Sequence, residues 1–453
     1  MFYYNGKLIR TVGFIGLGKS NIGVLKYLKK HYANLEFTLR SSSHVDIDCA
    51  IFKSCHFGKD SFKDITEDIL FLSPSVRRDI PELVRAARTG VILSSDTELF
   101  FSRAETDVYA VTGSDGKSTT TYLSACLLKS SYKDVFPCGN IGEAMTPHLD
   151  DAQDSAEVAE LSSFQLSYMK PKTRRAVITN VTKNHLNWHS SFEEYADAKK
   201  NILFRAHERI INFDCPLSQK LAEDFNIFAV FSRTLSEDDL RRKIHAELYV
   251  TLSDGIIKAS GEPILDVRKI RVGGDYNVLN FMAAIAMSYG RCAKDDVVRL
   301  AESFGGLKHR CELVAEKNGV KYYDSSIDSS PKRCAATLGS FDGRVTVIIG
   351  GKSKGLDFSE LLPVLSKKAK RIILTGECAY EIKEILDSNT SFASLGIPYD
   401  LIEDFGEAVK YSVVTARPYD SVILSPAATS YDRFKNFEER GDHFAKLIKE
   451  FTK

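Results

Sequence analysis

A glycine loop between an apolar run and a helical segment carries the strongest chemical signal in the chain. The string DVYAVTGSDGKSTTT places Gly113 and Gly116 after a run typical of a buried strand, and Lys117 and Ser118 at the start of a helix. Glycines let backbone N–H groups approach phosphate oxygens, while a lysine and a hydroxyl here contact the β/γ-phosphates and Mg²⁺. Because Val111 replaces the first glycine of the usual motif, this is a shorter variant. We predict ATP binding, against the alternative of a turn that only caps a helix.

A lysine lies on the apolar face of another predicted helix. In SFEEYADAKKNILFRA, Lys199 falls on the stripe formed by Phe192, Tyr195 and Ile202, whose spacing is typical of a core-facing helix. Lys200 points about 100° away from it. A buried lysine must pair, extend its tip to solvent, or be neutral and chemically modified. The ordinary alternative is an aliphatic stem that covers the core with its tip in water.

Two further polar residues follow apolar runs near the glycine loop. Glu160 ends the run EVAE, and His185 comes soon after AVITNV. The carboxyl ends of parallel strands deliver functional groups to one edge of a sheet. Glu160 and His185 are therefore candidate site residues beside Lys199, and Mg²⁺ binding there requires mainly oxygen ligands.

A second glycine loop, GFIGLGKSN, follows the first apolar run. Gly16 and Gly18 fit a dinucleotide fingerprint, but Asn21 occupies the position of its third glycine. The loop indicates a nucleotide or another phosphate-bearing ligand, with a simple tight turn as the alternative. Arg40 stands where an acidic residue would hold a ribose, which disfavours an NAD-dependent oxidoreductase.

Strand-like runs alternate with amphipathic helical segments along most of the chain, a pattern typical of α/β layers. We predict three domains: residues 1–105, 106–306 and 307–453. A length of 453 residues allows each of them its own core.

Composition excludes several classes of protein. The chain is 43% apolar and 27% charged, with a net charge of +1, so neither wholesale disorder nor general binding to nucleic acid is expected. No stretch approaches the roughly 20 apolar residues of a membrane span, and no signal peptide is evident. The nine cysteines form no CxxC pair. We expect a cytoplasmic protein with reduced thiols and no membrane insertion.

Seven strings together resemble the Mur ligase family over essentially the whole chain. In order they are VTGSDGKSTTT, GNIG, ELSSFQL, NVTKNHLNWH, YADAKKNI, LKHRCE and SPAATSYDRFKNFEERG. ELSSFQL and FKNFEERG are the most typical of the family members that add D-glutamate. The DNPR string of the relatives that add diaminopimelate or lysine is absent.

This resemblance implies a Rossmann-like UDP-substrate domain, a central P-loop ATPase-type domain and a Rossmann-like C-terminal domain that brings the amino acid. The implied reaction activates the carboxylate of UDP-N-acetylmuramoyl-L-alanine with ATP as an acyl phosphate. D-glutamate then attacks to form an amide of a peptidoglycan precursor. Two Mg²⁺ ions and a Lys199 carbamate formed from CO₂ are implied as well, and we expect a monomer.

The resemblance also carries roles to individual residues. The resemblance implies that the catalytic residues are Lys117, Glu160, His185 and Lys199. It implies that the metal ligands are Ser118, Glu160, His185 and carbamylated Lys199. ATP contacts fall to Gly113, Ser114, Asp115, Gly116, Lys117, Ser118, Thr119, Asn277, Asn280, Arg310 and Asp324. Contacts to the UDP-substrate fall to Gly18, Lys19, Ser20, Asn140, Ser162 and Gln165, and those to D-glutamate to Lys354, Ser430, Tyr431 and Phe437.

Departures from the family pattern keep alternatives open. Ser326 and Asp328 stand where a lysine and a threonine are usual. The extra carboxylate would repel glutamate unless a cation such as Lys332 or Arg333 compensates, so a ligase for a different amino acid is one alternative. A non-catalytic nucleotide-binding relative is another. Asn21 and Arg40 leave the uridine contacts undefined.

Overall fold

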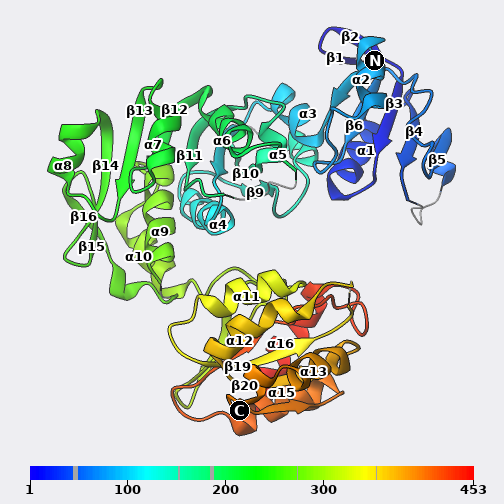
Figure 1. Ribbon diagram of the computed structural model, residues 1–453. Helices are drawn as coiled ribbons and strands as arrows, with labels where there is room; N and C mark the ends of the chain where they lie inside the picture. The colour runs from blue at the N-terminus through cyan, green and yellow to red at the C-terminus, as the bar shows by residue number, and fades with distance from the viewer. Residues whose placement is uncertain (44–48, 152–153, 184–187, 273, 354) are drawn as a thin grey trace. The chain divides into compact units, whose positions relative to one another are not determined.

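The computed structural model describes residues 1–43, 49–151, 154–183, 188–272, 274–353 and 355–453. Contacts divide the chain into two compact units, Met1–Ser303 and Phe304–Lys453. The described residues form three sheets made largely of parallel strands, together with one short antiparallel hairpin (Figure 1). The predicted α/β class is confirmed. No helix in the described part of the chain is both long and apolar enough to cross a membrane.

The first sheet has five parallel strands in the order β5-β4-β3-β6-β7. Successive residues of its strands face opposite cores: Ile69 and Phe71 pack with α1, while Leu70 and Leu72 pack with α2. The elements are β1 (Phe2–Tyr4), β2 (Lys7–Ile9), β3 (Thr11–Ile15), α1 (Lys19–His31), β4 (Glu36–Ser41), η1 (Cys49–Ile51), β5 (Ser54–Phe57), β6 (Ile69–Leu72), α2 (Pro81–Arg88), β7 (Ile92–Ser94) and α3 (Asp96–Arg103).

The second sheet has nine strands in the order β16-β15-β14-β13-β12-β11-β8-β10-β9. The strands from β14 to β9 in this order are parallel, while β15 and β16 add an antiparallel edge. The elements are β8 (Asp107–Thr112), α4 (Lys117–Leu128), β9 (Val135–Gly139), η2 (Thr146–Asp150), β10 (Ala156–Glu160), α5 (Ser163–Leu166), β11 (Lys172–Ile178), α6 (Phe192–Lys200), η3 (Asn201–Leu203), β12 (Arg205–Asn212), α7 (Pro216–Ala222), β13 (Ile227–Ser232), α8 (Glu237–Lys243), β14 (Ala246–Ser253), β15 (Ile256–Ala259), β16 (Glu262–Asp266), η4 (Val267–Lys269), α9 (Asp275–Ser288) and α10 (Lys294–Ser303).

A buried carboxyl near the start of β10 makes stability depend on pH. Glu157 is 0% exposed, and burial raises its pKa from 4.5 to about 7, although a hydrogen bond from Thr106 and the charge of His148 oppose the rise. The folded chain therefore keeps this proton at pH values where the unfolded chain has lost it. Stability should fall as pH rises from about 4.5 to 7, by about 3 kcal/mol.

We expect Glu157→Gln to melt at a higher temperature than the wild type at pH 8, because an amide cannot ionise. At pH 4.5 the two chains should melt closely together. Thermal unfolding followed by circular dichroism at both pH values measures this difference. Equal melting temperatures at pH 8 would contradict the raised pKa.

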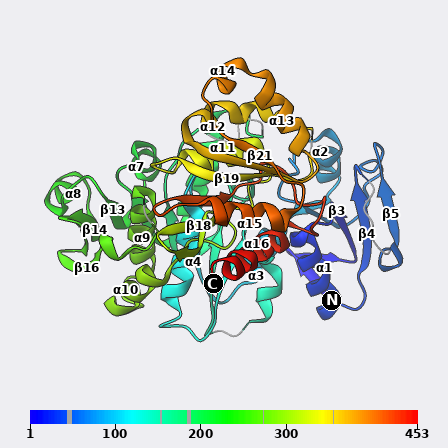
Figure 2. The same ribbon diagram turned by 90° about the horizontal axis from the view of Figure 1, so that it is seen from below.

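The third sheet lies in Phe304–Lys453 and has six strands in the order β17-β18-β22-β19-β20-β21. Val347, Ile349 and Leu374 face a core with α11, α12 and α13, while Ile348 and Ile373 face one with α15 and α16. Helices therefore cover both faces, and α15 packs beside α16 (Figure 2). The elements are β17 (Glu312–Lys317), β18 (Val320–Asp324), α11 (Pro331–Gly339), β19 (Val345–Gly350), η5 (Phe358–Leu361), α12 (Leu362–Lys368), β20 (Ala369–Thr375), α13 (Ala379–Ser388), α14 (Thr390–Ala393), β21 (Tyr399–Leu401), α15 (Phe405–Thr415), β22 (Ser421–Leu424) and α16 (Phe437–Phe451).

The three largely parallel sheets use strands from within the predicted ranges 1–105, 106–306 and 307–453, respectively. The domain boundaries themselves stay predictions.

Candidate active site

The glycine loop joins β8 to α4 in a conformation that needs its glycines. Gly113 and Gly116 have φ values of 155° and 77°, which residues with a side chain rarely adopt. A Cβ atom would collide with Thr179 Oγ1 at the first position and with Asn280 Oδ1 at the second. The loop therefore lies directly against its neighbours, with its backbone at the N-terminus of α4, as a phosphate site requires.

Side chains fasten this loop to the segment that follows β11. Ser114 Oγ donates to Thr182 O over 3.0 Å and accepts from Thr182 N over 2.8 Å, while Asp115 N donates to Asn180 Oδ1 over 2.9 Å. Lys117 Nζ donates to Ser114 O over 2.9 Å, so its ammonium group lies over the loop. The cation therefore lies where phosphate charge would need it.

Glu160 lies at the carboxyl end of β10, beside β8 and β9. Its side chain is 1% exposed, and Oε1 accepts a 2.7 Å hydrogen bond from Asn140 Nδ2. Among the described residues, Oε2 has no hydrogen-bond partner. A buried carboxylate oxygen is costly to leave unpaired, and oxygen is the ligand that Mg²⁺ prefers. The carboxylate of Glu160 and the hydroxyl of Ser118, which lies in the first turn of α4, are therefore of the kind that suits a magnesium ion.

Lys199 points inward, as the helical spacing predicts. It is 1% exposed, and Nζ donates to Gly113 O over 2.7 Å and lies 4.6 Å from the centre of the Tyr195 ring. Burial and the nearby charge of Lys117 hold its pKa well below the usual range, although the charge of Glu160 opposes this. Lys200 instead pairs with Asp224 over 2.8 Å. The buried amine therefore lies directly at the glycine loop.

Some of the other residues predicted to bind ATP lie close to the glycine loop. Ser118 and Thr119 lie in the first turn of α4, and Asn280 in α9 accepts from Thr120 Oγ1 over 3.4 Å. Asn277 lies one turn earlier on α9 and is buried. The structure thus brings α9 to the glycine loop. His185 lies outside the described residues.

The predicted UDP-substrate residues lie in two places. Gly18 caps α1, and Lys19 and Ser20 are its first residues. Ser162 and Gln165 form a capping box at the start of α5, and Gln165 Nε2 also donates to Thr97 Oγ1 over 2.9 Å. Asn140 follows β9 and is exposed, although its amide contacts Glu160.

The two departures from the fingerprint pattern, at Asn21 in α1 and Arg40 in β4, have structural roles. Asn21 Nδ2 donates to the carbonyls of Ile15, Gly16 and Phe71, and thereby holds the loop that the third glycine of the fingerprint would support. Arg40 is 3% exposed and pairs with Glu67 over 2.7 Å. Arg40 therefore makes internal bonds and is not presented to a ribose.

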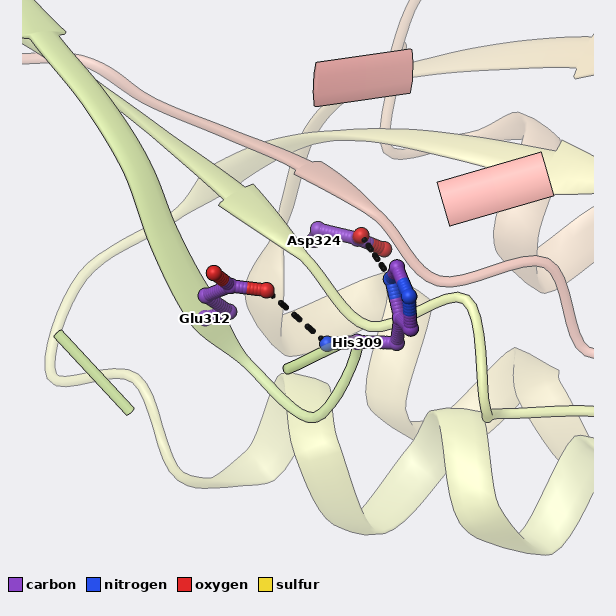
Figure 3. A group of neighbouring side chains, drawn as sticks. All are labelled: His309, Glu312 and Asp324. Atoms are coloured by element: carbon purple, nitrogen blue, oxygen red, sulfur yellow. Dashed lines mark hydrogen bonds and ion pairs between the residues drawn. The ribbon is translucent and has the colours of Figure 1, made fainter. Parts of the chain in front are cut away.

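In the second unit, His309, Glu312 and Asp324 gather at the start of β17 and the end of β18 (Figure 3). His309 Nδ1 and Asp324 Oδ2 lie 2.7 Å apart, and His309 N donates to Glu312 Oε2 over 2.9 Å. The charge of Asp324 raises the pKa of His309 against the effect of burial. The His309 ring nitrogen already bonds to Asp324, and Glu312 Oε2 already accepts from His309 N, so we interpret the group as a hydrogen-bonded network.

Asp324 is 0% exposed, and both its oxygens accept bonds, from Ser326 N and from the His309 ring. This burial gives no support to a direct contact with ATP, which stays a prediction. Arg310 is exposed next to His309 and stays a predicted ATP contact.

Three of the residues predicted to bind the amino acid lie just before α16 or at its start. Ser430 is 2% exposed, Tyr431 is 65% exposed, and Phe437 is the first residue of the helix. Lys354 lies outside the described residues.

The extra carboxylate at Asp328 is satisfied internally. It is 4% exposed and accepts a 2.8 Å bond from Ser425 Oγ. Burial raises its pKa, and the charge of Arg333 opposes the rise. Lys332 is 84% exposed and lies 3.9 Å from Glu360. Of the two cations expected to compensate Asp328, the structure therefore supports Arg333.

Comparison with known proteins gives the family. Residues 111–288 match the family model described as Mur ligase middle domain, and residues 309–428 match the one described as Mur ligase, glutamate ligase domain. Over 97% of this chain and 96% of each relative, the sequence is 37% and 35% identical to proteins named UDP-N-acetylmuramoylalanine–D-glutamate ligase, from Acetivibrio thermocellus and Ruminiclostridium cellulolyticum, respectively.

This chain belongs to the Mur ligase family.

Solved structures of the family share its fold. The UDP-N-acetylmuramate–alanine ligase from Thermotoga maritima superposes with a TM-score of 0.57 at 18% identity, covering 98% of this chain and 100% of the other. A UDP-N-acetylmuramoyl-L-alanyl-D-glutamate–2,6-diaminopimelate ligase gives 0.55 at 17% identity, covering 97% and 92%. The family uses ATP and Mg²⁺, which agrees with the glycine loop and the oxygen donors at Glu160 and Ser118.

Proposed function

We propose that this chain joins D-glutamate to UDP-N-acetylmuramoyl-L-alanine in an ATP-dependent step of peptidoglycan precursor synthesis. The observation that carries the proposal is full-length similarity to ligases with this printed activity. Asp328 is buried and bonded to Ser425, which supports a dicarboxylate amino acid because this carboxylate is turned to an internal partner.

The first chemical step transfers the γ-phosphoryl group of ATP to the substrate carboxylate. A carboxylate oxygen attacks phosphorus, the bond to the β-phosphate oxygen breaks, and ADP leaves with that electron pair. Backbone N–H groups between Gly113 and Lys117 and the Lys117 ammonium group would hold the phosphates and stabilise the charge that develops on them. The exposed Asn140 amide, bonded to Glu160, lies at the same sheet edge.

Magnesium would be held by Ser118 and Glu160, with His185 and a carbamate on Lys199 at a second ion; when bound, the ions neutralise phosphate charge. Carbamylation needs a neutral amine, which attacks CO₂ through its lone pair and loses a proton. Burial lowers the pKa of Lys199, which favours that neutral form of the amine. The product replaces a costly buried cation with anionic oxygen donors.

The second step forms the amide. The neutral amine of D-glutamate attacks the acyl carbon, inorganic phosphate leaves with the electron pair of the broken C–O bond, and the nitrogen gives up one proton to the leaving phosphate or to water. Lys354, Ser430, Tyr431 and Phe437 would bind the amino acid, and a lysine with backbone N–H groups suits its two carboxylates.

The deciding experiment measures ADP release and amide formation from ATP, Mg²⁺, UDP-N-acetylmuramoyl-L-alanine and each of several amino acids. We expect amide formation with D-glutamate and not with L-glutamate, L-lysine or diaminopimelate. Preference for another amino acid would favour the ligase of different specificity. Nucleotide binding without ADP release would favour the non-catalytic relative. Monomeric state and cytoplasmic location remain parts of the proposal.

A further inference from the structure

Arg440 is a buried cation beside the carboxyl ends of strands in the six-stranded sheet. It lies in the first turn of α16 and is 2% exposed. Strands β18, β22 and β19 run parallel side by side, and ligands of open α/β sheets bind outside the carboxyl ends of such strands.

The guanidinium group bonds to the loops that leave two of these strands and lies close to the loop that leaves the third. Nε donates to Ser326 Oγ over 2.9 Å, and Nη2 donates to Ser326 O over 2.9 Å and to Ala428 O over 3.1 Å. A Cβ atom on Gly351 would lie 3.0 Å from Nη1. Ser326 follows β18, Ala428 follows β22 and Gly351 follows β19. A single side chain therefore fixes the spacing of these loops.

Two of these contacts lead to residues that are predicted to bind the amino-acid substrate. Ser326 Oγ, which accepts from Arg440, donates to Phe437 O over 2.8 Å. Ala428 stands two residues before Ser430, and Ala427 has a φ of 58°, a conformation unfavourable for a residue with a side chain. The loop at Ala427 therefore needs outside contacts to keep its shape, and Arg440 supplies one.

The guanidinium group stays charged in this position. Burial lowers the pKa of Arg440 to about 10, and the charges of Asp432, Asp324 and Asp328 oppose the fall. Nη1 has no hydrogen-bond partner within the described ranges. If the side chain lost its charge or its planar set of N–H donors, the Ser326 and Ala428 carbonyls would have no donor from this position.

We propose that Arg440 is a positioning residue for the amino-acid substrate, which sets the Ser430 loop and Phe437 in the geometry that receives its carboxylates. The inference rests on the proposed function, because that function defines the amino acid.

The test compares the wild type with Arg440→Lys, which keeps the positive charge but loses the planar guanidinium group and its several N–H donors. We expect the KM for D-glutamate to rise at least about tenfold, with the KM values for ATP and the UDP-substrate changed less than about twofold. Hydroxylamine traps an acyl phosphate as a hydroxamate without using the amino-acid site. Hydroxamate formation should therefore persist in the variant. Arg433→Lys is the matched control, because Arg433 is exposed on the same segment and, among the described residues, its side chain bonds only to Glu403 O.

Ser326→Ala provides a second test if Arg440→Lys fails to fold, and should raise the same KM by a smaller factor. In Arg440→Ala, added guanidinium ion should lower the KM again. An unchanged KM for D-glutamate in Arg440→Lys and Ser326→Ala, or an equal fall in amide and hydroxamate formation, would overturn the inference. Failure of the wild type to join D-glutamate while it forms hydroxamate would instead overturn the proposed amino-acid specificity.

Discussion

Lys199→Ala should lower turnover by at least about 100-fold, because the variant would lose the proposed carbamate, an anionic ligand, and the charge stabilisation that it would support. The wild-type amine is 1% exposed and lies 2.7 Å from Gly113 O at the phosphate loop. Alanine cannot carry a carbamate. A short carboxylic acid added to the buffer should restore part of the rate by placing carboxylate oxygens in the vacated space.

The matched control is Lys200→Ala. Lys200 neighbours Lys199 in sequence but pairs with Asp224 on the outer side of α6, so its loss should leave turnover near the wild-type value. Coupled ADP release measures both variants. Carbon-13 NMR with labelled bicarbonate should show a carbamate signal in the wild type and in Lys200→Ala, but not in Lys199→Ala. Full activity of Lys199→Ala would remove Lys199 from the site.

Local sequence rules were sufficient for the glycine loop and for the choice between adjacent lysines. The 3.6-residue helical period placed Lys199 inward, and the structure confirms it. The loop needs glycine at Gly113 and Gly116 for reasons visible in their φ values. These features depend on residues close in sequence, so periodicity and turn chemistry can identify them.

Contacts that depend on strand order could not be derived in the same way. Asn140 and Glu160 come together because β9 pairs with β10, and no spacing rule gives that pairing. Arg440 and Ser326 are 114 positions apart in the chain. The string FKNFEERG drew attention to Phe437 and not to Arg440, since an arginine near a helix start is ordinarily exposed.

Two substitutions show how a side chain can replace a motif residue by a different interaction. The Asn21 amide binds three backbone carbonyls where the fingerprint has glycine. Asp328 looked like an obstacle to a dicarboxylate substrate, yet its bond to Ser425 and the charge of Arg333 account for it within the fold. The sequence shows that a motif residue is substituted, but only the packed structure shows which contacts the new side chain makes in its place.

Glu160→Gln is the sharpest test of the magnesium assignment, because it removes one charge and almost no volume. The amide oxygen of glutamine can still accept from Asn140 Nδ2, so the bond that orients the side chain is retained. The unpartnered position of Oε2 would hold a neutral group instead of an anionic ligand. Turnover should fall at least about 100-fold, and the Mg²⁺ concentration needed for half-maximal rate should rise.

Glu157→Gln is the control for this change, because it makes the same substitution at another buried position of β10. Glu157 bonds to Thr106, which precedes β8, whereas Glu160 lies at the carboxyl end of β10 beside the glycine loop. The control should therefore keep the wild-type rate and Mg²⁺ dependence at pH 7.5, while its melting temperature rises. If Glu160→Gln also kept both kinetic properties, the buried oxygen at the end of β10 would not be a metal ligand. Loss of activity in both variants would instead point to a general sensitivity of this strand to substitution.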